Sequence, residues 1–292
     1  MDLDDIKESS NVEDRRSSRG GFGGGVSMRS LFMLAPIIRM LLKTKFGWAI
    51  IAIGAFLYFS GYNPLSLATG VGSSSLVSPK ENQEAKFIKK VLATTESVWS
   101  DILPKYGIRY QKPKLVLYKG RTTSGCGFAS AQIGPFYCPA DRKVYLDLGF
   151  FDELARRHNS PGDFAQAYVL AHEIGHHIQN LQGTLSKVQQ LQQRFGGNSA
   201  KANALQVRVE LQADCYSGVW ANHAQKKFGV LERGDIEEAL RAASSIGDDT
   251  LQKEAQGYVV PDSFTHGSSR ERVEWFKRGF LSGDLRSCNT FN

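Results

Sequence analysis

The sequence predicts an α+β fold, in which a mainly helical domain with a small β-sheet follows one N-terminal transmembrane helix. Two short runs, 114–118 and 143–148, are rich in Val, Leu and Tyr and have the composition of strands. Beyond them, apolar residues recur mostly at helical spacing. Nearer the N-terminus, the run 46–62 carries no charge. We therefore expect a small sheet packed on helices in one domain, residues 80–292, joined to a membrane anchor.

The first 45 residues are expected to form a basic, glycine-rich arm on the cytoplasmic side. Seven basic residues and no acidic ones lie between Arg15 and Lys45, which equals the whole net charge of +7. With a pI near 9.2, a nucleic-acid contact is one alternative for such an arm. The apolar run that follows argues instead for a membrane, so we expect no nucleic-acid partner. A chain of 292 residues, 41% hydrophobic, fits one tethered domain better than two full domains.

The run 46–62 is expected to be a single transmembrane helix. As a helix it spans about 25 Å, the lower limit for a bilayer core of about 30 Å, with tryptophan and tyrosines near its ends. A buried core helix is the alternative, but the preceding basic cluster favours insertion, and no clear cleavage site indicates a signal peptide. Basic residues stay on the cytoplasmic side, which places the N-terminus inside and residues 80–292 in the periplasm, beside the inner membrane. Residues 63–79, with serines, glycines and two prolines, are expected to be a flexible linker.

The folded domain is expected to begin near Lys80 with an amphipathic helix over 81–103, which Pro104 ends. The glycine-containing segment between the two strands is expected to form a hairpin or an irregular loop. Six further helices are expected, over 150–157, 164–181, 186–195, 199–223, 235–245 and 268–281.

The helix expected over 164–181 contains His172-Glu-Ile-Gly-His176, the H-E-x-x-H order of zinc hydrolases. An i,i+4 spacing turns two side chains to one side of a helix, so both histidines can bind one metal ion. Glu173 leans to the side of that pair, where its carboxylate can touch a metal-bound water, so it is the candidate general base. Gly175 indicates close packing or a site that a side chain would obstruct. The alternative is a chance match on a buried helix, with the histidines hydrogen-bonded in the core.

A catalytic zinc ion usually has three protein ligands and an open fourth position, so a third ligand is needed. The helix expected over 199–223 offers Glu210 and Asp214, again at i,i+4 on one face. Glu210 can complete the metal site, and Asp214 can accept the free N–H of a ligating imidazole and so fix its tautomer. The alternative is a solvated acidic face.

These residues resemble motifs of known metallopeptidases. H-E-x-x-H followed by Glu210 and Asp214 resembles the gluzincins, in which two helices supply two histidines and a glutamate, and this implies a zincin-like fold. More closely, several segments look like the bacterial putative neutral zinc metallopeptidase family, namely 10–16, 124–130, 134–141, 172–179 and 210–216. The resemblance covers most of the chain and implies a peptide or protein substrate, but little about which one.

The chain has four cysteines, and none forms a close C-x-x-C pair typical of a structural zinc site. An even number outside the cytoplasm indicates disulfides. Cys126 and Cys138 lie within the expected hairpin loop and are the simplest pair, which leaves Cys215 for Cys288. Buried free thiols are the alternative.

The motifs together predict a membrane-anchored metallopeptidase that requires Zn²⁺. Zinc held by His172, His176 and Glu210 lowers the pKa of a water molecule, and Glu173 takes its proton before attack on a peptide carbonyl. A noncatalytic extracytoplasmic binding or scaffold module with a structural zinc site is the alternative, and it predicts bound zinc without turnover.

One further histidine is a candidate for the oxyanion, which usually needs a donor besides the metal. His266 precedes the last helix, where a serine cap can hold its turn rigid. The segment also looks like membrane-associated gluzincins, in which a histidine followed six positions later by an arginine lies near the metal. Here Arg272 has that place and is expected to position His266 or the substrate. A histidine that caps the helix or packs in the turn is the alternative.

Overall fold

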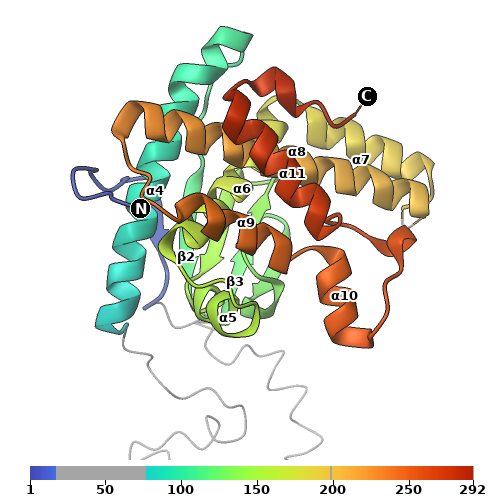
Figure 1. Ribbon diagram of the computed structural model, residues 1–292, viewed down its shortest axis with the longest axis horizontal. Helices are drawn as coiled ribbons and strands as arrows, with labels where there is room; N and C mark the ends of the chain where they lie inside the picture. The colour runs from blue at the N-terminus through green and yellow to red at the C-terminus, as the bar shows by residue number, and fades with distance from the viewer. Residues whose placement is uncertain (18–76, 198, 292) are drawn as a thin grey trace, which may run out of the picture. The chain divides into compact units, whose positions relative to one another are not determined.

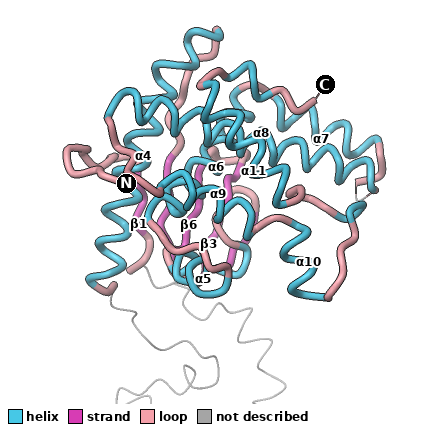
Figure 2. The backbone as a smooth tube through the Cα atoms, in the orientation of Figure 1, coloured by secondary structure: helices cyan, strands magenta, loops and turns pink. Residues whose placement is uncertain are grey.

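The computed structural model describes residues 1–17, 77–197 and 199–291, and Met1–Arg16 and Val77–Asn292 form one compact unit (Figure 1). The unit is a mainly helical α+β fold with small sheets, as expected (Figure 2). Within the described ranges no helix is long and apolar enough to span a membrane. The expected transmembrane helix 46–62 lies outside those ranges.

A four-stranded sheet packs one face against the helices. Its order is β1-β2-β6-β5, in which β1, β2 and β6 are parallel and β5 is antiparallel. The strands are β1 (Val12–Asp14), β2 (Lys114–Tyr118), β5 (Phe136–Cys138) and β6 (Lys143–Asp147). Because side chains alternate along a strand, Leu115 and Leu117 enter the main core with the helices, whereas Val116 and Tyr118 face a second, smaller cluster.

Two further strands lie outside the four-stranded sheet. They are β3 (Arg121–Ser124) and β4 (Gly127–Ser130), and they pair as the expected hairpin. The Cys126–Cys138 disulfide, with an S–S distance of 2.04 Å, ties the hairpin turn to β5. This pairing confirms the prediction and fixes the hairpin beside the sheet edge.

The N-terminal segment is part of this unit. Backbone N–H of Leu115 donates to Asn11, and that of Arg15 donates to Leu117, on either side of the β1–β2 pairing. The Arg16 guanidinium is buried and donates to the carbonyl of Glu81 at 2.7 Å, at the start of the first long helix. The expected single arm over 1–45 therefore does not hold for residues 1–16. The composition of residues 1–16 carried no signal of this pairing, because backbone groups on the edge of β2 provide it.

The helices follow the expected positions closely. A Ser78 capping box begins α4, and a Ser268 capping box begins α11. Their bounds are α4 Pro79–Ile102, α5 Gly149–Arg157, α6 Asp163–Leu181, α7 Thr184–Arg194, α8 Ala200–Phe228, α9 Asp235–Ser245, α10 Asp248–Gln256 and α11 Ser269–Ser282. Short 3₁₀ turns are η1 Leu103–Tyr106, η2 Ala131–Ile133, η3 Pro261–Ser263 and η4 Leu285–Cys288. The helix α10 was not predicted, and it matters for the site described below.

Three helices meet closely in the core because glycines remove side chains at the crossings. A Cβ on Gly175 of α6 would lie 3.0 Å from the backbone of Ala213 in α8, which explains the glycine inside the H-E-x-x-H helix. A Cβ on Gly218 or Gly279 would collide with backbone across the α8–α11 crossing.

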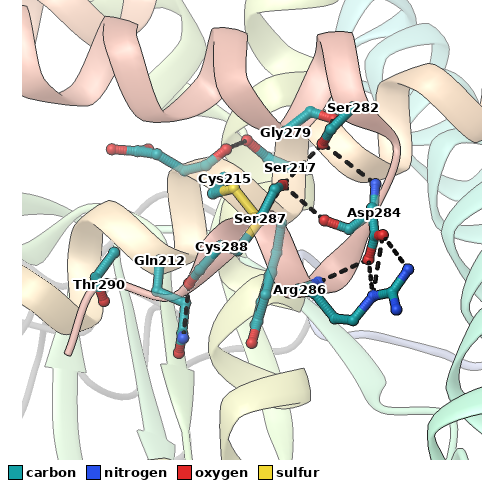
Figure 3. Close-up of a disulfide and its surroundings, with 12 residues drawn as sticks. Gln212, Cys215, Ser217, Gly279, Ser282, Asp284, Arg286, Ser287, Cys288 and Thr290 are labelled. Atoms are coloured by element: carbon teal, nitrogen blue, oxygen red, sulfur yellow. Dashed lines mark hydrogen bonds and ion pairs between the residues drawn. A yellow bond between two sulfur atoms is a disulfide. The ribbon is translucent and has the colours of Figure 1, made fainter. Parts of the chain in front are cut away.

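A second disulfide, Cys215–Cys288, then joins α8 to the C-terminal turn after α11, as predicted (Figure 3). Gln212 donates to the carbonyl of Cys288 at 3.0 Å beside it. The position of α11 against α8 is thus held by close packing, a covalent bridge and hydrogen bonds.

Candidate metal centre

Helices α6 and α8 bring the three expected metal ligands together. Nε2 of His172 lies 3.1 Å and Nε2 of His176 lies 3.4 Å from one oxygen, Oε2 of Glu210. Zinc bonds of about 2.0–2.1 Å in tetrahedral geometry put ligand atoms about 3.3 Å apart. Two imidazole nitrogens and a carboxylate oxygen at this spacing fit a zinc ion, and His-His-carboxylate is a donor set that zinc enzymes use.

The other nitrogen of each histidine is held by a hydrogen-bond acceptor. Nδ1 of His172 donates to Oδ1 of Asp214 at 2.8 Å, which is the contact expected for that carboxylate. Nδ1 of His176 donates to Oε1 of Gln179 at 2.9 Å, one turn along the same helix. Since each Nδ1 carries the proton, each Nε2 lone pair is left to face Glu210 and a metal ion.

Two amide side chains that the sequence analysis did not single out steady this arrangement. Gln179 donates to the carbonyl of Val209 at 2.7 Å, which keeps its oxygen turned toward His176. Gln206 donates to Oε1 of Glu210 at 2.9 Å, which leaves the other oxygen for the metal. Helical spacing is the signal that was available, because Gln179 lies three residues after His176 and Gln206 four before Glu210.

Asp214 also belongs to a fully buried ionic network. The Arg272 guanidinium contacts both of its oxygens, with Nε at 2.8 Å and Nη2 at 3.0 Å, and the Tyr168 hydroxyl donates to Oδ1 at 2.5 Å. Burial alone would raise the pKa of Asp214, but the charge of Arg272 and the bond to His172 hold it at about 2. The network therefore keeps a carboxylate charged behind His172.

Arg272 was expected to position His266 or the substrate, and the structure gives it another partner. Its guanidinium binds Asp214, Tyr168 and the carbonyl of Ile246, and within the described residues it has no hydrogen bond to His266. The packing of α11 on α8 explains the difference, because it places Arg272, in the first turn of α11, beside Asp214 near the middle of α8.

His266 is held by Asp248, the first residue of the unpredicted helix α10. Oδ2 of Asp248 accepts the backbone N–H groups of Thr265, His266 and Gly267 at 2.6–3.0 Å, so it fixes the whole turn. Oδ1 lies 3.3 Å from Nδ1 of His266 and raises the pKa of that imidazole. The ring is also among the residues that line the cavity at the metal ligands.

Glu173 lies in the same cavity, which has a volume of about 950 Å³ and reaches all three metal ligands. Its side chain is nearly buried, and its carboxylate makes no hydrogen bond to another residue in the described part of the chain. The carboxylate is therefore free to accept a proton from a water molecule in the cavity.

A His-His-Glu metal group with a free glutamate beside it, on two packed helices, is the arrangement of a zinc hydrolase. Comparison of the whole sequence identifies the family. Residues 1–291 match the putative neutral zinc metallopeptidase family, and the chain belongs to it.

Two curated relatives extend the comparison. The chain is 49% identical over 291 residues to the uncharacterized protein YpfJ of Escherichia coli K12, which covers 98% of this chain and 96% of the relative. It is 43% identical over 216 residues to the uncharacterized protein Mb2605 of Mycobacterium bovis, which covers 70% of each chain. No solved structure matches.

Proposed function

We propose that this protein is a membrane-anchored zinc endopeptidase that hydrolyses peptide bonds. One observation carries the proposal: two imidazole nitrogens converge on one oxygen of Glu210 at zinc spacing, in a cavity that Glu173 also lines. A structural zinc site is normally closed by a fourth protein ligand. Within the described residues the metal group has three members and borders a cavity, which favours a catalytic site.

A zinc ion held by His172, His176 and Glu210 would lower the pKa of a water molecule and polarise the substrate carbonyl. Glu173 accepts the proton of the attacking water and then delivers it to the nitrogen of the leaving amine. Asp214 and Gln179 keep the two imidazoles in the tautomer that leaves Nε2 free.

His266 is the proposed donor to the oxyanion. Asp248 orients its ring through Nδ1, and the raised pKa favours the form in which Nε2 carries a proton to donate. Arg272 does not contact the substrate in this proposal. It keeps Asp214 ionised, and Asp214 in turn accepts the hydrogen bond from His172.

The test is Glu173→Gln, which keeps the shape of the side chain and removes the base. Zinc content and melting temperature should stay at the wild-type level, while peptides released from a denatured proteome should disappear. Glu254→Gln, on the exposed face of α10, is the matched control and should cleave like wild type. Undiminished release by Glu173→Gln would remove Glu173 from the reaction, and zinc binding with no release by wild type would support the noncatalytic module.

We further propose that the domain works outside the cytoplasm, where its two disulfides can form, and that 46–62 anchors it. The expected orientation, with the N-terminus inside, would part β1 from β2 across the membrane. We therefore revise the single crossing: we propose that Met1–Arg16 and Val77–Asn292 lie on the same outer side and that 46–62 anchors the chain without placing them on opposite sides.

Two variants that each add one cysteine at an exposed position test this arrangement, Asp5→Cys on the N-terminal segment and Lys253→Cys on α10. A membrane-impermeant maleimide should label both on intact cells. Labelling of position 253 alone, with position 5 reacting only after lysis, would restore the original orientation and separate β1 from the fold.

A further inference from the structure

The walls of the catalytic cavity are nearly free of charge. In the whole chain 22% of residues are charged. Among the described residues that line the cavity there is no lysine and no aspartate, and the charged ones are Glu173, Glu210 and Arg272. Each of these already has a partner or a role, because Arg272 is neutralised by Asp214 and the two glutamates belong to the proposed reaction.

Neutral side chains form the two walls. On the sheet side, Ile133, Phe136 and Phe150 line the cavity. On the α7 side, Leu185 and Val188 line it together with amides such as Gln189. Amides and backbone groups can hydrogen-bond a peptide backbone, but they cannot neutralise a charged side chain.

Two histidines besides the metal ligands line the cavity. His266 faces Asp248 at 3.3 Å, so a protonated ring there has its counter-ion. His158, at the end of α5, is the other.

From these walls we infer that the site selects peptide segments whose side chains around the scissile bond are uncharged. This inference rests on the proposed function. A charged substrate side chain would lose its water on entering the cavity and find no partner of opposite sign, whereas an apolar or amide side chain would find matching walls. The turn after β4 and the helix α7 also carry exposed apolar side chains. Ile133 in that turn is 60% exposed, and Phe195 at the end of α7 is 42% exposed. Unfolded or extended polypeptide is the form of substrate that presents such segments.

Two measurements on the full-length, zinc-loaded protein test the inference. In the first, wild type is incubated with a denatured proteome and the cleavage sites are mapped by mass spectrometry. Asp, Glu, Lys and Arg should each be depleted about tenfold at the positions beside the scissile bond. Equal cleavage beside charged residues would overturn the inference while leaving the peptidase itself established.

A charge placed on the wall should change the selection. Gln189→Glu adds a negative charge to the α7 wall and should enrich Lys and Arg about 3- to 10-fold at one cleavage position. Gln190→Glu is the matched control, since the next residue is also exposed on α7 and does not line the cavity. Identical profiles from both variants would show that this wall does not meet the substrate and would overturn the inference.

The second measurement does not need turnover. Zinc-loaded Glu173→Gln protein is titrated with a fluorescent, extended peptide of Ala, Leu, Ser and Gln, and with versions that carry Glu or Lys at the centre. The uncharged peptide should bind about tenfold more tightly. If wild type never cleaves but this preference holds, the proposed function fails and the selectivity stands. If all three peptides bind equally, the selectivity fails.

Discussion

The buried contact between Asp214 and Arg272 yields the sharpest test of how the metal site is built. Asp214→Asn keeps the shape of the side chain and removes its charge, so Arg272 is left buried without a counter-ion. Removing one partner of a buried ion pair costs about 3–5 kcal/mol. For a unit of this size, that loss lowers the melting temperature by roughly 6–20 °C. The same substitution weakens the acceptor for Nδ1 of His172, which should lower zinc affinity about 10- to 100-fold.

The two effects can be separated by a second substitution. Arg272→Met in the Asp214→Asn background removes the unpaired cation, and an ion pair replaced by neutral groups is often nearly neutral for stability. The double variant should therefore recover most of the lost stability, measured on zinc-free protein by urea unfolding. Its zinc affinity, measured by competition with a chromophoric chelator, should stay low because His172 still lacks the carboxylate.

Two results would refute this reasoning. A zinc affinity of Asp214→Asn within threefold of wild type would show that the carboxylate does not orient His172. A double variant no more stable than Asp214→Asn would show that the buried charge of Arg272 is not the source of the loss.

Three further predictions address the ligands and the oxyanion donor. His172→Ala, His176→Ala and Glu210→Ala should each lose stoichiometric zinc, and full zinc in all three by metal analysis would reject this ligand set. His266→Ala should lower kcat by about 10²- to 10³-fold with zinc content and melting temperature nearly unchanged, whereas a loss that tracks unfolding would make its role structural. Asp248→Asn should lower the pKa of His266 in an NMR titration, because the carboxylate raises it. Because that pKa is raised on folding, its contribution to stability is complete below about pH 6.5 and should fade as pH rises through the folded-state pKa.

Much of the metal site could be predicted because it depends on spacing within single helices. His172 and His176 lie one turn apart on α6, and Glu210 and Asp214 lie one turn apart on α8. Helical geometry alone then decides which side chains share a face. Gly175 also carried a signal in the sequence, where it indicated close packing or a site that a side chain would obstruct, and the structure shows close packing against Ala213.

The remaining parts depend on how elements pack and had weaker signals. The strand β1 is three residues, Val-Glu-Asp, and its pairing comes from backbone groups on the edge of β2, which no side-chain pattern reveals. The helix α10 begins with Asp248-Asp-Thr and has few apolar positions, so its periodicity is weak. The partner of Arg272 is decided by the α8–α11 crossing, and its distance along the chain from His266 says nothing about that crossing.

The charges around the metal ligands lead to a last prediction, in which the two halves of one ion pair have opposite effects. Glu210 and Asp214 each contribute one negative charge and Arg272 one positive charge, all buried. Removing the charge of Asp214 makes this sum neutral, whereas Arg272→Met makes it more negative and leaves the bond from Asp214 to His172 in place. Both single variants should unfold more easily, because each leaves a buried charge without its partner. Only Asp214→Asn should weaken zinc, and Arg272→Met should bind it at least as tightly as wild type, since a divalent cation favours the more negative site. Zinc affinity is measured by chelator competition at a temperature where each variant is folded. Equal losses of affinity in both variants would mean that the network acts through packing and that its charge does not affect zinc binding.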